Sequence, residues 1–144
     1  MTTQVPLEEG YFRLPSGKPG DLGALLGSYS PQTGKYFFPR RKLCPITSGP
    51  VENCELPAKG ILYSWTYVKD PRMGTLKMGD QGGYGVGQID LPGGVRIQSV
   101  IRGQQGDWEI GMPMRIAFQP VKMPGKRQDD SVEHMTFCFE PDRD

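Results

Sequence analysis

Short apolar runs separated by turn residues are the feature that most limits what this chain can fold into. The 144 residues include 20 Gly and 14 Pro, spread along the chain rather than gathered in one tract. Because Gly and Pro interrupt regular structure, each element between them must be short. Short strands joined by tight turns are typical of β-sandwiches and small β-barrels. The pattern therefore predicts one mainly β domain with a core of ordinary size.

Five runs from Gly60 onward have the composition or alternation of β-strands. They are residues 61–68, 84–91, 95–102, 112–121 and 133–140. Five strands in about 80 residues, without a long helix between them, favour the OB-fold, a five-stranded barrel. The helix that usually lies between its third and fourth strands is expected to shrink to residues 103–110. We therefore assign residues 60–144 to an OB-fold domain.

The first 29 residues have little regular pattern. Pro6, Pro15 and Pro19 interrupt any periodicity, and a short helix is expected only over residues 21–26, where Asp21 would cap the start. We expect this extended N-terminal arm, residues 1–29, to lie against another surface rather than to fold alone. It has no basic region followed by an apolar stretch, so it is not interpreted as a secretory signal.

Cysteine content and hydropathy indicate the compartment. The chain has three cysteines without a close pair, which argues against a disulfide framework. No run approaches the ~20 apolar residues that a membrane span requires. The sequence therefore favours a reducing cytoplasm.

Residues 30–59 resemble a zinc-ribbon segment that has lost its ligands. A structural zinc ion needs four thiolate or imidazole ligands, normally from two Cys-x-x-Cys pairs. Cys44 occupies one such position, but Ser30, Thr33 and Thr47 occupy the other three. Hydroxyl groups are poor zinc ligands, and adding the nearby Cys54 does not close a four-ligand site. We therefore expect no structural zinc and interpret Cys54 as a small buried residue.

A catalytic pair is not evident. His134, the one histidine, and Cys138 fall on the same face of the last predicted strand. Four residues along a strand separate two side chains by about 13 Å, too far for a thiolate-imidazole hydrogen bond. We interpret both as outward-facing residues with Thr136 between them, and predict no catalytic residue.

Two further motifs have simpler explanations than catalysis or binding. Residues 82–87 are rich in glycine, but they lead into a strand, whereas phosphate-binding glycine loops lead into a helix N-terminus. Asp129 and Asp130 lie close to Lys126 and Arg127, as in a solvated turn. We interpret the first motif as a hairpin loop and the second as an exposed turn.

The charge of the chain limits its partners. Seventeen Lys and Arg against sixteen Asp and Glu give a net charge of +1, without the broad positive field that drives binding to nucleic acid or acidic membranes. Arg40, Arg41 and Lys42 form the one compact basic cluster. Because arginine presents a planar fork of donors, this cluster could contact a coenzyme A phosphate or partner carboxylates. It could equally be a solvated loop.

The first predicted strand has an aromatic face. Tyr63, Trp65 and Tyr67 alternate with smaller residues. Such a face stacks bases in nucleic-acid-binding OB-folds, and forms core or interface in an accessory subunit.

Several motifs, in this order and spacing, resemble one protein family. They are Leu26-Gly27-Ser28, Phe37-Phe38-Pro39-Arg40-Arg41, Cys44-Pro45, Gly60-Ile61-Leu62-Tyr63-Ser64-Trp65, Val86-Gly87-Gln88-Ile89-Asp90-Leu91-Pro92-Gly93-Gly94-Val95-Arg96 and Phe139-Glu140-Pro141. Across residues 5–141 the chain is similar to acyl-CoA-associated proteins that join a rubredoxin-like zinc ribbon to an OB-fold, the domain of unknown function thirty-five family.

The resemblance implies a small non-catalytic subunit of a thiolase-type complex. Members of this family accompany enzymes such as benzoylsuccinyl-CoA thiolase and the aldolase that shortens steroid side chains. It implies a cytoplasmic hetero-oligomer whose partner supplies the catalytic residues and whose substrate is an acyl-CoA, with aromatic compound catabolism as the favoured setting. The N-terminal arm is expected to wrap that partner, which could be a thiolase, acyltransferase, synthase or aldolase.

Two other functions are alternatives to the accessory-subunit role. An OB-fold nucleic-acid-binding protein is the main alternative, and the near-neutral charge opposes it. A free-standing enzyme is the other, but the sequence lacks a convincing set of acid, base and nucleophile.

Overall fold

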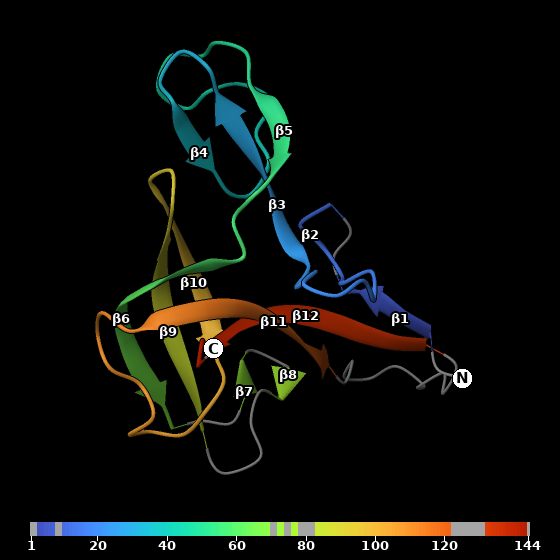
Figure 1. Ribbon diagram of the computed structural model, residues 1–144, viewed down its shortest axis with the longest axis vertical. Coiled ribbons are helices and arrows are strands. Elements are labelled where there is room, and N and C mark those ends of the chain that lie inside the picture. The colour runs from blue at the N-terminus through green and yellow to red at the C-terminus, as the bar shows by residue number, and fades with distance from the viewer. Residues whose placement is uncertain are drawn as a thin grey trace.

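The computed structural model describes residues 3–7, 10–69, 72–73, 76–77, 83–121 and 132–143. These residues form twelve strands and no helix (Figure 1). The mainly β fold that the Gly and Pro pattern predicts is confirmed. Two of the strands, β7 (Arg72–Met73) and β8 (Leu76–Lys77), pair only with each other.

Five strands close the barrel predicted from the sequence. They are β6 (Lys59–Val68), β9 (Tyr84–Leu91), β10 (Val95–Ile101), β11 (Pro113–Val121) and β12 (Val132–Pro141). Their cyclic order is β6-β9-β10-β12-β11, and β11 returns to β6. All neighbours are antiparallel except β10 and β12, which are parallel. Each predicted range agrees with the observed strand to within two residues, and the OB-fold is confirmed.

Trp108 closes the barrel where a helix was expected. Residues 103–110 form turns without a helix, so the expected short helix is not formed. Instead, Trp108 enters the core with 5% of its surface exposed, and its indole N–H donates to the carbonyl of Arg102 at 2.9 Å. Gly85 leaves the room for this ring, because a Cβ atom there would overlap it.

The N-terminal arm packs on the barrel of its own chain. β1 (Thr3–Pro6) runs parallel to the start of β12, and β2 (Phe12–Arg13) pairs with β3 (Ala24–Ser30). Phe12 is buried in the main core, where its ring lies 5.6 Å from that of Phe118. The described part of the arm therefore lies against a surface, as expected, but that surface belongs to this chain.

The helix predicted over residues 21–26 is wrong. β3 begins at Ala24, and Gly23 before it has a φ of 81°, outside the helical region. The Asp21 carboxylate accepts hydrogen bonds from the amides of Ser16 at 2.8 Å and Gly23 at 3.0 Å. These local bonds favour a turn, since a short acidic side chain competes with helix formation by binding nearby amides.

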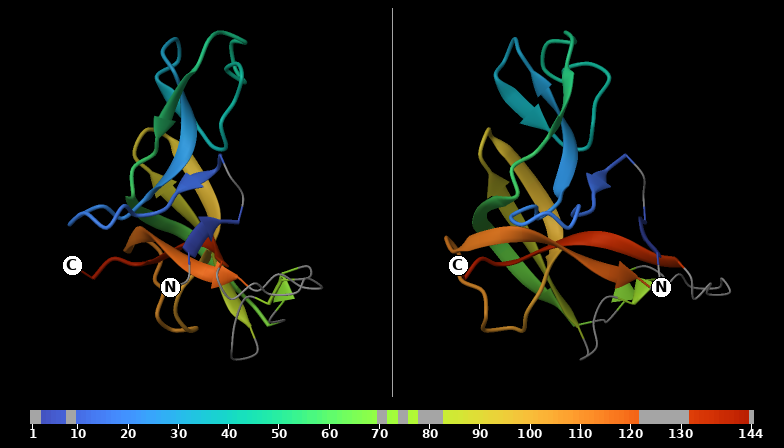
Figure 2. Two further views of the ribbon diagram at one scale, coloured as in Figure 1. Left: turned by 90° about the vertical axis from the view of Figure 1, so that its right-hand side faces the viewer. Right: turned by 45° about the vertical axis from the view of Figure 1, so that its right-hand side comes forward.

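A three-stranded ribbon extends beyond one end of the barrel (Figures 1 and 2). β3 is central, with β4 (Lys35–Phe37) on one side and β5 (Glu52–Glu55) on the other. β3 begins within the predicted arm and ends at Ser30, the first residue of the predicted ribbon segment. Leu25 and Leu56 belong to the same buried cluster as the barrel core, so the ribbon and barrel share apolar packing.

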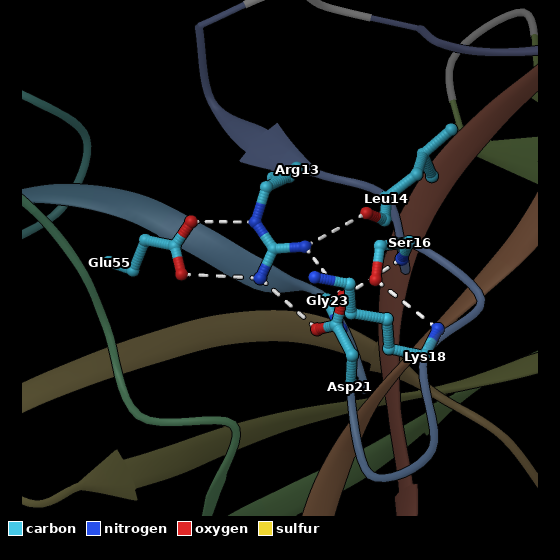
Figure 3. Close-up of polar contacts among 7 residues, drawn as sticks. All are labelled: Arg13, Leu14, Ser16, Lys18, Asp21, Gly23 and Glu55. Atoms are coloured by element: carbon cyan, nitrogen blue, oxygen red, sulfur yellow. Dashed lines mark hydrogen bonds and ion pairs between the residues drawn. The ribbon is translucent and has the colours of Figure 1, made fainter.

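A three-residue clamp, Arg13, Asp21 and Glu55, joins the arm to the ribbon (Figure 3). Arg13 donates to both carboxylates, with Nη1 2.9 Å from Asp21 Oδ2 and Nε 2.6 Å from Glu55 Oε2. These bonds to Arg13 lower the pKa of both acids below their ordinary values. Since the folded pKa values are depressed, the clamp stabilises the fold when both acids are ionised.

This clamp predicts a pH-dependent loss of stability for Arg13→Ala. The difference in melting temperature between wild type and variant should be constant from neutral pH down to about pH 5. It should shrink as the pH falls through 3.8, the ordinary pKa of Asp21, and below, because the carboxylates of the unfolded chain and of the variant then take up protons. Thermal unfolding followed by circular dichroism at several pH values checks this. Lys18→Ala, in the same loop, is the control, and a difference that grows in acid would contradict the account.

Candidate functional site

The ribbon contains two similar turns. The first follows the end of β3. Ser30 and Thr33 are separated by two residues. The amide of Gly34 donates to the carbonyl of Ser30 at 2.8 Å, and the amide of Lys35 donates to Oγ1 of Thr33 at 3.3 Å. The second hydroxyl of the pair therefore caps the turn that follows it.

The second turn repeats this pattern. Cys44 and Thr47 are again separated by two residues. The amide of Ser48 donates to the carbonyl of Cys44 at 2.8 Å, and the amide of Gly49 donates to Oγ1 of Thr47 at 3.1 Å. The ribbon thus contains two turns with the same spacing and the same hydrogen-bond pattern, at the positions predicted to derive from zinc-ligand pairs.

The structure brings Cys44 together with two of these hydroxyl residues. The thiol is buried, and hydrogen bonds from Ser30, then Thr47, lower its pKa from the ordinary 9.0 to about 6. The Thr47 hydroxyl lies 2.8 Å from Oε1 of Gln32, and this contact ties the second turn to the first. Hydrogen bonds therefore join the two turns.

The side chains present do not fit a structural zinc ion. The four positions offer one thiol and three hydroxyls, whereas structural zinc sites are built from four thiolates or imidazoles. Within the described ranges, no three His, Cys, Asp or Glu side chains converge on one point. Cys54 on β5 is half-buried rather than buried, and desolvation raises the pKa of its thiol.

The basic cluster lies in the loop between these turns. Arg40, Arg41 and Lys42 are exposed, and none of the ion pairs formed within the described residues involves them. Ser28 on β3 holds the loop in place. Its hydroxyl accepts a hydrogen bond from the amide of Arg41 at 2.8 Å and lies 3.4 Å from the carbonyl oxygen of Arg41. The structure therefore presents three uncompensated charges on a supported loop.

Two exposed aliphatic side chains follow the basic cluster in the sequence. Leu43 is 56% exposed and Ile46 is 59% exposed. We define the ribbon tip as the six residues Lys35, Arg40, Arg41, Lys42, Leu43 and Ile46. Sequence reasoning singled out the basic cluster but missed the two aliphatic residues. The available signal was their position on either side of Cys44 in a polar segment.

Cys138 does not face outward as expected. It is fully buried and packs with Tyr84 and Val100 in a second, smaller cluster. The interpretation failed because this side of β12 is covered by apolar residues, which period-two alternation on one strand does not reveal. Burial raises the pKa of the Cys138 thiol to about 11, and a thiol of this kind is chemically inert at neutral pH. His134 is half-buried on the same strand.

A β-bulge divides the aromatic face of β6. The pairing register with β9 shifts between Leu62 and Ser64. Trp65 and Tyr67 consequently pack against Trp108, with ring centroids 5.4 and 6.4 Å from it. Tyr63 instead points outward beneath the Arg96 guanidinium, 3.5 Å from the ring centroid. The strand therefore does not offer the continuous stacking platform of a single-strand binder.

The remaining motifs are partly outside the described residues. Tyr84 to Gly87 of the glycine-rich segment belong to β9 and pair with β6, so this part of the segment is strand and the hairpin-loop interpretation is wrong for it. Asp129 and Asp130 lie outside the described residues. In the part of the chain that is described, no helix is long and apolar enough to cross a membrane.

The fold defines a class of protein, an OB-fold barrel with an attached three-stranded ribbon. Residues 54–119 match the family described as the C-terminal OB-fold domain of ChsH2. A DUF35 domain-containing scaffold protein of Methanothermobacter thermautotrophicus is 32% identical over 120 residues, covering 81% of this chain and 86% of the relative. A scaffold protein of the same description from Methanocaldococcus jannaschii is 28% identical, covering 81% of each.

The chain belongs to the DUF35 family, which confirms the resemblance found in the sequence. The Ltp2-ChsH2(DUF35) aldolase contains a chain with the same fold. The TM-score is 0.59, with 19% identity over 82% of this chain and 84% of that one.

Proposed function

We propose that this chain is a non-catalytic accessory subunit of a heteromeric thiolase-type complex that acts on acyl-CoA substrates. One observation carries the proposal. A supported loop exposes three charges that form no ion pair with any of the described residues, beside two exposed aliphatic side chains. Such a surface is suited to binding, and similar proteins in the same family are described as scaffold proteins.

The placement of the candidate nucleophiles supports a non-catalytic role. Cys138 is enclosed and its pKa is raised, so it is poorly suited to attack a thioester. Cys44 is buried among hydroxyls in the ribbon, whereas His134, the natural general base, lies on β12. The catalytic cysteine and histidines of the complex would therefore come from its partner.

The basic cluster provides candidate contacts for this role. Arg40, Arg41 and Lys42 would meet either a coenzyme A phosphate or partner carboxylates. The proposal places the complex in the cytoplasm, with aromatic compound catabolism as the favoured setting. No tightly bound cofactor is proposed.

Affinity purification of the tagged chain from its own cells, followed by mass spectrometry, tests this proposal. The expected result is a stoichiometric thiolase-like subunit. Recovery of a different class of enzyme would overturn the thiolase assignment. Recovery of the chain alone, under gentle conditions and low salt, would overturn the accessory role.

A further inference from the structure

We propose that the ribbon tip docks onto a protein surface with an apolar centre and an acidic rim. This inference rests on the proposed function, because it states which face binds the catalytic partner and what the partner's surface must contain. Three properties of the tip support it: its charge, its apolar area and its rigidity.

Charge is strongly concentrated at this end of the molecule. Residues 22–51 contain four Lys and Arg and no Asp or Glu. Because the whole chain has only one more base than acid, the rest of the chain has three more acids than bases. A near-neutral chain therefore carries a distinctly positive ribbon. Charge complementarity requires carboxylates, or another anion, in whatever binds there.

The aliphatic residues distinguish a protein from other anionic ligands. A coenzyme A phosphate or a nucleic acid would satisfy the cations of the tip but leave Leu43 and Ile46 in water. A protein surface can cover both aliphatic groups and pair with the cations of the same loop. Apolar residues at the centre with Arg at the edge are the usual anatomy of an interface. The two kinds of exposed residue together favour a protein.

Internal hydrogen bonds hold the tip in place before binding. Ser28 fixes the backbone of Arg41, and the turn after Cys44 is joined through Thr47 to Gln32. A loop that is already ordered loses little conformational entropy on association. The tip is thus built as a preformed contact surface.

Paired variants of the full chain test the inference against the partner identified by co-purification. Leu43→Asp/Ile46→Asp and Arg41→Glu/Lys42→Glu should each weaken assembly at least about 30-fold, the effect of losing an interface hot spot. The charge variant's defect should shrink in high salt. Ile110→Asp alters an aliphatic residue that is 66% exposed on the barrel, and Lys18→Glu/Lys69→Glu alters exposed cations elsewhere. Both controls should change affinity less than about threefold, since such distant sites lie outside the interface.

Photocrosslinking identifies the occupant directly. With p-benzoylphenylalanine at Leu43, the cross-linked peptide of the partner should contain or adjoin several Asp or Glu residues. A cross-link to a second copy of this chain, or to a partner surface without acids, would overturn the inference. Charge-dependent binding of coenzyme A or single-stranded DNA to the full chain, lost in Arg41→Glu/Lys42→Glu but unaffected by Leu43→Ala, would overturn it too. If the wild-type complex forms and the tip variants assemble as well as wild type, the docking inference is wrong and the proposed function stands. If the wild-type chain forms no complex, both the proposed function and the docking inference are wrong.

Discussion

Replacing Ser30, Thr33 and Thr47 together by cysteine is expected to produce a chain that binds one zinc ion tightly. The wild-type chain is expected to carry no stoichiometric zinc. The two ribbon turns share one hydrogen-bond pattern, and Cys44 already supplies a thiol at the fourth position. Four thiolates on such turns form a closed site, whose apparent binding free energy is about 10 kcal/mol or more at neutral pH. Elemental analysis after gel filtration measures the metal content.

Partial variants provide the control for this prediction. Ser30→Cys/Thr33→Cys leaves Thr47 in place, so it should bind zinc more weakly and lose it to a chelator more readily. The melting temperature of the triple variant should rise with zinc and fall on chelation, because the metal binds only the folded ribbon. A triple variant without zinc would show that the paired turns are not arranged as a knuckle. One tight zinc per wild-type chain would show that hydroxyl positions do not exclude the metal.

Trp108→Ala is expected to lower the free energy of unfolding by about 3–5 kcal/mol. The ring fills the barrel at the position where a helix was expected, and it packs against Trp65, Tyr67 and Gly85. The substitution removes this packing together with the hydrogen bond from the indole to Arg102. A loss of this size is a large part of the stability of a small domain. Urea unfolding followed by circular dichroism measures it.

Two variants bracket the Trp108 prediction. Trp108→Phe keeps an aromatic ring in the core but removes the indole donor, so its loss should be clearly smaller. Ile110→Ala changes the most exposed apolar residue of the same loop and should stay within about 0.5 kcal/mol of wild type. A decrease in the free energy of unfolding below about 1 kcal/mol for Trp108→Ala would contradict the conclusion that this ring fills the barrel core, given the usual cost of such truncations.

The barrel was predictable because its signals are local. Each strand is an alternating or β-rich run bounded by Gly, Pro or another turn residue, so β9 and β10 were placed to within one residue. The two ribbon turns had a sequence signal in the equal spacing of Ser30 and Thr33 and of Cys44 and Thr47, whereas their descent from a zinc ribbon stays a prediction.

Features that depend on tertiary contacts were missed. The Asp21 carboxylate was taken for a helix cap because its partner Arg13 could not be identified from the sequence. The bulge after Leu62 redirects Trp65 inward, and Cys138 is buried by strands distant in sequence. The exposure of Leu43 and Ile46 is also a tertiary property, so these two apolar residues of the ribbon tip could be identified only from the structure.

Reconstitution of the chain with its co-purified partner tests the central claim most directly. Acyl-CoA thioester turnover is measured for the chain alone, the partner alone and the assembled complex. We expect no turnover by the isolated chain. Complexes carrying Cys138→Ala or His134→Ala should retain turnover within about twofold of wild type, because the proposed function assigns the catalytic groups to the partner. Turnover by the isolated chain, or a loss of about a thousandfold from either substitution with assembly intact, would contradict a non-catalytic role.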